Sequence, residues 1–281
     1  MKIELVSCLY SKLHNTEFYG RTSRHHHYIC SLKSLQCMNL PIHVFTSNSH
    51  TNDLASYSDN VILHVDELDK LPVYNKIKQL KTQVKLIPQR CYEIMYSKTK
   101  WLRDVMTTTD SDYYFWIDVG LSHNGIFPKH MKRDENTDHC SKYFDFDVFD
   151  ERLIPGLIDR SKGKIYSICF DQSIRKWNAY IDSKYINNPP AGKYHMIGGL
   201  FGGTKTMMMQ FCDMFDEILD KTINDKILPT EEEIYTAIVN NNEHMFHQDF
   251  FNSWYYEGHD LYTSWTANME VVTPFCNLFK V

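Results

Sequence analysis

The sequence has few of the features that mark a specialised class of protein. Its 281 residues include 8 cysteines without a C-x-x-C pair, 11 glycines and 9 prolines, and they contain no N-x-S/T sequon. No stretch reaches the roughly 20 apolar residues of a membrane span, and "MKIELVSCLY" has too short an apolar run for a signal peptide. We therefore expect buried thiols rather than disulfides or a zinc site, in a cytoplasmic protein without a membrane span.

A large excess of charge of one sign is also missing, because the formal net charge is −5. This near balance gives no general reason to expect binding to nucleic acid. One segment differs, since residues 70–103 hold nine Lys or Arg against Glu93 alone. Such a segment is usually a solvated helical face; the alternative is a positive surface for the phosphates of a nucleotide or polynucleotide.

Strand-like and helix-like segments alternate along the chain, which indicates βαβ units. The expected strands are residues 2–10, 41–47, 60–68, 113–118 and 164–170. The expected helices are residues 24–38 and 89–107, an amphipathic helix capped near Thr204 and a helix capped by Thr230, and the last 40 residues read as irregular. No linker divides the chain, so we predict one α/β domain over residues 1–281 with a mostly parallel sheet flanked by helices.

The stretch "YYFWIDVGLSHNGIFP" is the first candidate for a site. Its aromatic and β-branched residues predict a buried strand that ends at Asp118, and open α/β sheets bind ligands at the carboxyl ends of their strands. A carboxylate there could hold Mg²⁺ or Mn²⁺ together with phosphate oxygens. The plainer alternative is that Asp118 only caps a turn.

The stretch "GGLFGG", residues 198–203, is the second candidate. We expect a strand to end here in a glycine turn before the amphipathic helix. The spacing matches neither a phosphate-binding P-loop nor a dinucleotide fingerprint. The glycines therefore predict either a tight turn with close helix packing or a backbone that a bulky polar ligand can approach.

Three glutamates follow Thr230 at the start of a helix. Acids there are usually surface residues favoured by the helix dipole, but one that faces a cleft could act as base or nucleophile. Glu231 and Glu232 are adjacent, so we expect only one of them to face a cleft. Glu232 is favoured because Ile234 and Ile238 mark the buried face.

Together these stretches resemble known transferases. "SKTKWLRDVM" followed by "DYYFWIDVGLSHNGIFP" is similar to the HtrL/YibB-like bacterial proteins, whose hallmark is a W-I-D-x-G-L-S-H run ending in F-P, and "RHHHYICSLKSLQCMNLPIHVFTS" is similar to their N-terminal pattern. "KYHMIGGLFGGTKTMMMQFCDMFDEIL" with "TEEEIYT" resembles the histo-blood-group type of retaining glycosyltransferase. The resemblance covers residues 1–240 and implies a GT-A, Rossmann-like fold and nucleotide-sugar-dependent transfer.

The resemblance also implies roles for particular residues. It places the family's D-x-D element at residues 116–120, with Gly120 where the second aspartate would stand. Mn²⁺ or Mg²⁺ would rest on Asp118, the donor diphosphate and a further ligand, for which His247 is the candidate. Glu232 or Glu231 would be the catalytic carboxylate. The residues implied at the nucleotide-sugar site are Ser7, Tyr10, Arg21, Arg24, Lys98, Trp116, Asp118, Gly120, His195, Gly198 and Gly199.

The implied function is transfer of a hexosyl or pentosyl group from a nucleotide sugar, expected to be a UDP-sugar, to a hydroxyl of a cell-surface polysaccharide or lipopolysaccharide. Residues 1–125 would bind the donor and residues 126–281 the acceptor. A phage DNA glycosyltransferase acting on 5-hydroxymethylcytosine is an alternative, because the composition suits an AT-rich genome and residues 70–103 could contact phosphates. A non-catalytic nucleotide- or glycan-binding protein is an alternative of another class, motivated by the missing second aspartate, and a phosphatase with Asp118 as nucleophile ranks last.

Overall fold

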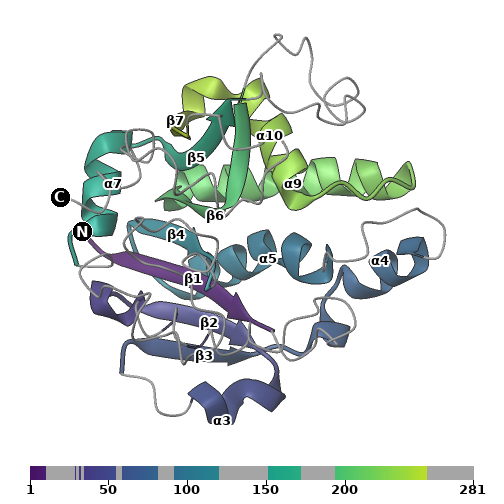
Figure 1. Cartoon of the computed structure of the whole chain (residues 1–281), viewed down its shortest axis with the longest axis horizontal. Coiled ribbons are helices and arrows are strands. Elements are labelled where there is room, and N and C mark those ends of the chain that lie inside the picture. The colour runs from purple at the N-terminus through teal and green to yellow at the C-terminus, as the bar shows by residue number, and fades with distance from the viewer. Residues whose placement is uncertain are drawn as a thin grey trace, which may run out of the picture.

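In the computed structural model, one seven-stranded sheet runs through the described part of the chain (Figure 1). The structure describes residues 1–10, 29, 32, 35–54, 59–81, 92–119, 151–171 and 194–251. The strands are β1 (Ile3–Leu9), β2 (Ile42–Thr46), β3 (Val61–Val65), β4 (Tyr113–Ile117), β5 (Ile165–Asp171), β6 (Tyr194–Thr204) and β7 (Phe246–Phe251). Their order is β3-β2-β1-β4-β6-β5-β7, and only β6 is antiparallel to its neighbours. The predicted α/β class with a mostly parallel sheet is confirmed.

Helices cover both faces of the sheet (Figure 1). On one face lie α5 (Tyr92–Thr108), α9 (Lys205–Asn224) and α10 (Glu231–Asn241), and on the other α7 (Leu153–Ser161) packs against β5 and β7. The shorter helices are α3 (Thr51–Leu54), α4 (Tyr74–Lys81), η2 (Gln36–Met38), η3 (Asn48–His50), η4 (Leu68–Lys70) and η8 (Glu243–Met245). Within the described ranges, no helix has the length and apolar character needed to cross a membrane.

Each face of the sheet has its own hydrophobic core, and β4 contributes to both. Side chains alternate along a strand, so Tyr114 and Trp116 lie in the core under α5, α9 and α10. Phe115 and Ile117 lie in the core under α7. All four side chains are fully buried. This is why the strand reads as an unbroken apolar run rather than as an alternating one.

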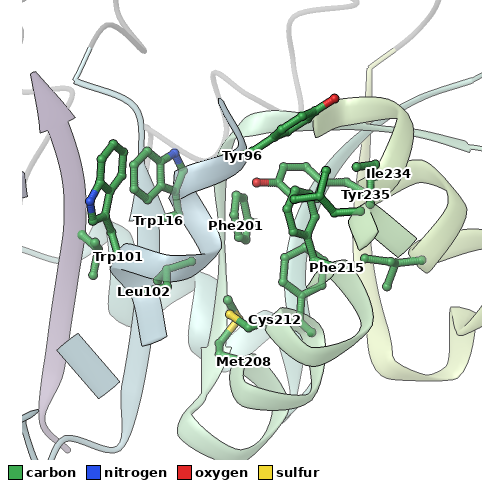
Figure 2. Packing of buried hydrophobic residues seen from close by; sticks show 14 of the residues in the cluster. Tyr96, Trp101, Leu102, Trp116, Phe201, Met208, Cys212, Phe215, Ile234 and Tyr235 are labelled. Atoms are coloured by element: carbon green, nitrogen blue, oxygen red, sulfur yellow. The ribbon is translucent and has the colours of Figure 1, made fainter. Parts of the chain in front are cut away.

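Aromatic contacts hold α10 against β6 and α9, and a hydrogen bond links its start to α5 (Figure 2). The ring centre of Tyr235 lies 5.2 Å from that of Phe201 in β6 and 5.3 Å from that of Phe215 in α9. Tyr96 of α5 donates a hydrogen bond to the carbonyl of Pro229, just before α10. The first turn of α10 is therefore placed beside both β6 and α5.

The glycines of "GGLFGG" lie inside β6, so the expected glycine turn is wrong. Gly202 pairs with Phe115 of β4, and a Cβ atom on this glycine would lie 2.3 Å from Cγ of the Phe115 ring. A Cβ atom on Gly203 would lie 3.3 Å from Cα of Ile165. These two glycines allow close approach of neighbouring strands and rings, and α9 begins only after the strand has ended.

Both predicted helix caps are confirmed. The side chain of Thr204 accepts a hydrogen bond from the backbone N–H of Met207 at the start of α9. Thr230 and Glu233 form a capping box at the start of α10, which satisfies two backbone N–H groups reciprocally.

The remaining predicted helices, and the region predicted to be irregular near the C-terminus, agree only in part with the structure. The helix expected over residues 89–107 is confirmed as α5, apart from its first three positions, which lie outside the described residues. Most of the helix expected over residues 24–38 is also outside them. The irregular structure expected near the end is wrong for β7, whose apolar residues pair with β5, and α7 was not predicted.

Candidate functional site

The candidate site lies where the order of the sheet reverses. From β1 the chain passes to β2 and β3 on one side and later to β4 on the other, so the carboxyl ends of β1 and β4 flank the topological switch point at which open α/β sheets bind ligands. Asp118 follows β4 here, and its backbone N–H donates to the carbonyl of Gly199 (2.8 Å). Antiparallel β6 thereby brings its first glycine pair to the end of β4.

Lys98 of α5 joins the parts of the site. Its Nζ lies 2.9 Å from Oδ1 of Asp118 and 3.2 Å from Oε1 of Glu231. It also donates to the carbonyl of Gly198 (3.0 Å). An ammonium group has three N–H donors, so these three contacts account for all of them. Lys98 can therefore contact a diphosphate, as the resemblance implies, only by giving up one of these protein oxygens.

The ammonium group is buried and charged. Lys98 and Glu231 are buried, whereas the side chain of Asp118 is 35% exposed. Burial by itself lowers the pKa of Lys98, but the charges of Asp118 and Glu231 outweigh it and raise that pKa above its ordinary value. Burial raises the pKa of the Glu231 carboxyl, and Lys98 only partly offsets this rise. Glu231 is therefore easier to protonate than an exposed glutamate.

Trp116 orients the carboxylate of Asp118. Its Nε1 donates to Oδ1 of Asp118 (2.7 Å), the same oxygen that Lys98 contacts. Nζ of Lys98 lies 5.3 Å from the centre of the Trp116 ring, a cation–π distance. Trp101 stacks beside Trp116 (Figure 2), with 6.2 Å between the ring centres. The carboxylate at the end of β4 is thus held from two sides.

Gly198 meets both of the first two glutamates of α10. Oε1 of Glu232 accepts from the backbone N–H of Gly198 (3.3 Å). A Cβ atom on Gly198 would lie 3.1 Å from Oε1 of Glu231 and 3.4 Å from Nζ of Lys98. Both glutamates thus lie near Gly198, because the first turn of α10 lies against β6; Glu231 is buried and Glu232 is partly exposed.

Two buried polar atoms in this cluster have no hydrogen-bond partner within the described residues: Oε2 of Glu231 and Oη of Tyr235. The two residues are four apart and share one face of α10. Cε2 of Tyr235 lies 3.4 Å from the position of a Cβ atom on Gly198, so this ring also borders the site. Buried polar groups are seldom left unpaired, so the two atoms mark a place where a polar ligand or water can bind.

The donor set does not suit a divalent cation shared by the two carboxylates, because Nζ of Lys98 already contacts both Asp118 and Glu231. The other expected ligand, His247, lies on β7, three strands and about 14 Å from β4 at the usual spacing. Its ring stacks on Tyr166, whose side chain lies in the core of the opposite face. The structure does not bring His247 to Asp118. Across the described ranges, no group of three or more His, Cys, Asp or Glu is placed to hold a metal ion.

The two predicted site residues in and after β1 are separated by the sheet. Tyr10 lies on the side of Trp116, where its hydroxyl donates to the carbonyl of Asp66 (2.6 Å). Ser7 is buried, and strand alternation points its side chain to the opposite face. A contact of the Ser7 side chain with a ligand beside Lys98 is therefore not supported.

The remaining predicted positions are less informative. His195 lies in β6 and pairs with Phe170 of β5. Arg21, Arg24 and Gly120 lie outside the described residues.

Sequence reasoning missed a second aspartate at this edge of the sheet. Asp66 follows β3 as Asp118 follows β4, and its Oδ2 accepts from Nε1 of Trp101 (3.1 Å) and lies 3.4 Å from Nζ of Lys100. The available signal was "VILHVDEL", another apolar strand that runs directly into an aspartate. Tyr235 was missed as well, and its signal was the four-residue spacing from Glu231 on one helix.

The basic residues at the C-terminal end of the segment 70–103, which lie on α5, are paired with acids. In addition to the pairs of Lys98, Nη1 of Arg103 lies 2.7 Å from Oδ1 of Asp213, and its Nη2 lies 2.8 Å from Oδ2 of Asp216; both aspartates are in α9. Nζ of Lys100 lies 2.5 Å from Oδ2 of Asp104. Of the two original interpretations, these pairs favour a helical face that serves packing and charge balance over a surface reserved for phosphates.

Fold and site together define an α/β protein with a Rossmann-like sheet and a buried lysine–carboxylate cluster at its switch point. No family model matches the chain, and no curated protein matches it. A function must therefore be argued from the site.

Proposed function

We propose that the protein transfers a sugar from a nucleotide sugar, a UDP-sugar in the first instance, to a hydroxyl group of a cell-surface saccharide. One observation carries the proposal. The three segments that the resemblance singles out supply Asp118, Gly198 and Glu231, which all meet at Lys98. They meet at the switch point, where an open α/β sheet binds nucleotides.

The chemistry assigns separate tasks to the carboxylates. In a direct displacement, the bond between the sugar C1 and the diphosphate oxygen breaks and the electron pair leaves with the diphosphate. The acceptor oxygen bonds to C1, and its proton passes to a carboxylate base. Glu232 suits that task because it is only partly buried, whereas Glu231 is held by Lys98. Asp118, at 35% exposure, can accept hydrogen bonds from hydroxyls of the donor.

A saccharide acceptor is favoured over hydroxymethylated DNA. The basic residues of α5 that could contact a duplex are engaged with acids, as in the pairs that Arg103 makes with Asp213 and Asp216. A cytoplasmic location is part of the proposal and is supported by buried thiols. Burial raises the pKa of Cys169 to about 12, so this thiol is unreactive at neutral pH.

Calorimetry with UDP and an assay of UDP-sugar hydrolysis or transfer test the proposal. We expect UDP binding by the full chain, and loss of binding or turnover in Asp118→Asn. Asp110→Asn is the matched control, because Asp110 is exposed at the other end of β4. Glu232→Gln should lower turnover about 10²- to 10⁴-fold with little change in UDP affinity.

Absence of UDP binding to the wild-type chain would refute the proposal. UDP binding without turnover of any UDP-sugar, unaffected by Glu232→Gln, would instead establish the non-catalytic binding protein. Salt-sensitive retention of the protein on duplex DNA would instead support hydroxymethylated DNA as the acceptor.

A further inference from the structure

The ammonium group of Lys98 has the surroundings of a bound cation. Its oxygen ligands come from three different elements: Asp118 after β4, Gly198 in β6 and Glu231 in α10. Two of them are carboxylates, and the third is a backbone carbonyl, which is also the donor chemistry that hard cations use. The side chain is buried, so little water shares in this coordination.

A divalent cation cannot be added between the same carboxylates while this ammonium group stays. The metal would have to lie about 2 Å from each oxygen, within a few ångströms of a buried positive charge. Repulsion at that distance is strong where water is largely excluded. The ammonium group is also held in place, because it donates to the Gly198 carbonyl and lies 5.3 Å from the centre of the Trp116 ring.

We propose that Lys98 is the resident cation of this site. Its ammonium group takes the place between Asp118 and Glu231 that Mn²⁺ or Mg²⁺ would need, so the protein binds its ligand without a divalent metal. Lys98 acts as a positioning residue in this arrangement: it holds both carboxylates and the Gly198 carbonyl in one geometry.

The unpaired atoms beside the cluster agree with this assignment. Oε1 of Glu231 contacts Lys98, while Oε2 is buried without a partner within the described part of the chain. Here the second oxygen, together with Oη of Tyr235, is left for a polar group of the ligand.

Titration of the metal-stripped full chain with Mn²⁺, followed by the EPR signal of free Mn²⁺, tests the inference without any nucleotide. We expect the wild type to show no stoichiometric Mn²⁺ binding. Lys98→Met leaves the two carboxylates without their cation and should gain one Mn²⁺ site, with affinity at least about tenfold above wild type. Glu231→Gln added to Lys98→Met should remove that site again, and Lys98→Arg should not create it.

The outcomes are decisive in either direction. A tight Mn²⁺ site in the wild type that Asp118→Asn abolishes would overturn the inference, as would a folded Lys98→Met variant that binds no Mn²⁺. If circular dichroism shows that Lys98→Met is unfolded, the wild-type titration and its Asp118→Asn control still show whether the unaltered site binds Mn²⁺.

A second measurement rests on the proposed function. UDP affinity should be the same within about twofold in EDTA and in Mn²⁺, and a loss of about tenfold or more in EDTA would overturn metal independence. If UDP binds under neither condition, the proposed function fails, while the Mn²⁺ titration still decides on the role of Lys98.

Discussion

Replacing Lys98 with Met should lower the free energy of unfolding, by an amount that depends on how far its two carboxylate partners are buried. The variant keeps an apolar stem of similar volume but leaves buried Glu231 without a counter-ion, whereas Asp118, at 35% exposure, can be hydrated. At about pH 7 the least costly response of Glu231 is to bind a proton, which costs up to about 3.5 kcal/mol relative to the wild type, where burial already raises its pKa in part. The Gly198 carbonyl, which loses its donor, adds about 1 kcal/mol. We expect the free energy of unfolding to fall by up to about 4.5 kcal/mol, which is comparable with the usual cost of breaking a buried ion pair.

This loss of unfolding free energy, the stability deficit of Lys98→Met, should also depend on pH in a predictable direction. In both proteins burial raises the folded-state pKa of Glu231 above that of the unfolded chain, and the loss of Lys98 raises it further in the variant. The deficit disappears as the pH falls below the folded-state pKa of the wild type, because both folded proteins then bind the proton. The deficit should therefore shrink by about 1.4 kcal/mol per pH unit on acidification from neutrality.

Urea unfolding followed by tryptophan fluorescence and circular dichroism at several pH values measures this deficit, provided that the m-values agree. Lys100→Met is the control. Lys100 also contacts two acids, Asp66 and Asp104, but it is 34% exposed, so its loss should cost only about 0–1 kcal/mol without a pH trend. A Lys98→Met deficit below about 1 kcal/mol, or one independent of pH, would refute the argument that Glu231 depends on Lys98. So would failure of Glu231→Gln to recover stability in the Lys98→Met background.

Two further predictions concern other parts of the fold. Gly202→Ala should lower the free energy of unfolding by about 1–3 kcal/mol, because its Cβ would overlap the Phe115 ring. Gly203→Ala, whose nearest atom is 3.3 Å away, should cost clearly less in the same urea assay, and equal effects would contradict the overlap argument. Burial lowers the pKa of His43, against the pull of Glu4, and also that of His64, so the unfolded state binds more protons below the ordinary histidine pKa. The two histidines should therefore contribute a free energy of unfolding that rises with pH up to about pH 6.5. The stability of the wild type minus that of His64→Gln should increase over this range, and a difference that falls with pH would refute the argument.

Local patterns in the sequence were sufficient for several elements. The run of residues 113–118 predicted a buried strand because its aromatic and β-branched residues fit a strand covered on both faces. Thr230 and Glu233 predicted a helix start because a capping box involves only residues three apart. Each of these predictions depends on neighbours in the chain, which the sequence displays directly.

The glycine-rich stretch shows where local reading fails. By their own conformational freedom, Gly202 and Gly203 suggest a turn. The structure keeps them in β6 because the Phe115 ring and the backbone of Ile165 lie where their Cβ atoms would be. Those contacts come from residues far away in the sequence, so no local pattern could reveal them.

By itself, the sequence determined the α/β class, the strand that ends at Asp118, and the acidic helix start at Glu231, since these follow from periodicity and capping. Only the tertiary structure decided the sheet order, which removed His247 from the site and placed Ser7 on the far face. It also decided that Lys98, more than a hundred residues from Glu231, joins that glutamate to Asp118. The physical reason is that a buried ammonium group must find oxygen ligands wherever packing supplies them, and packing is a property of the whole fold.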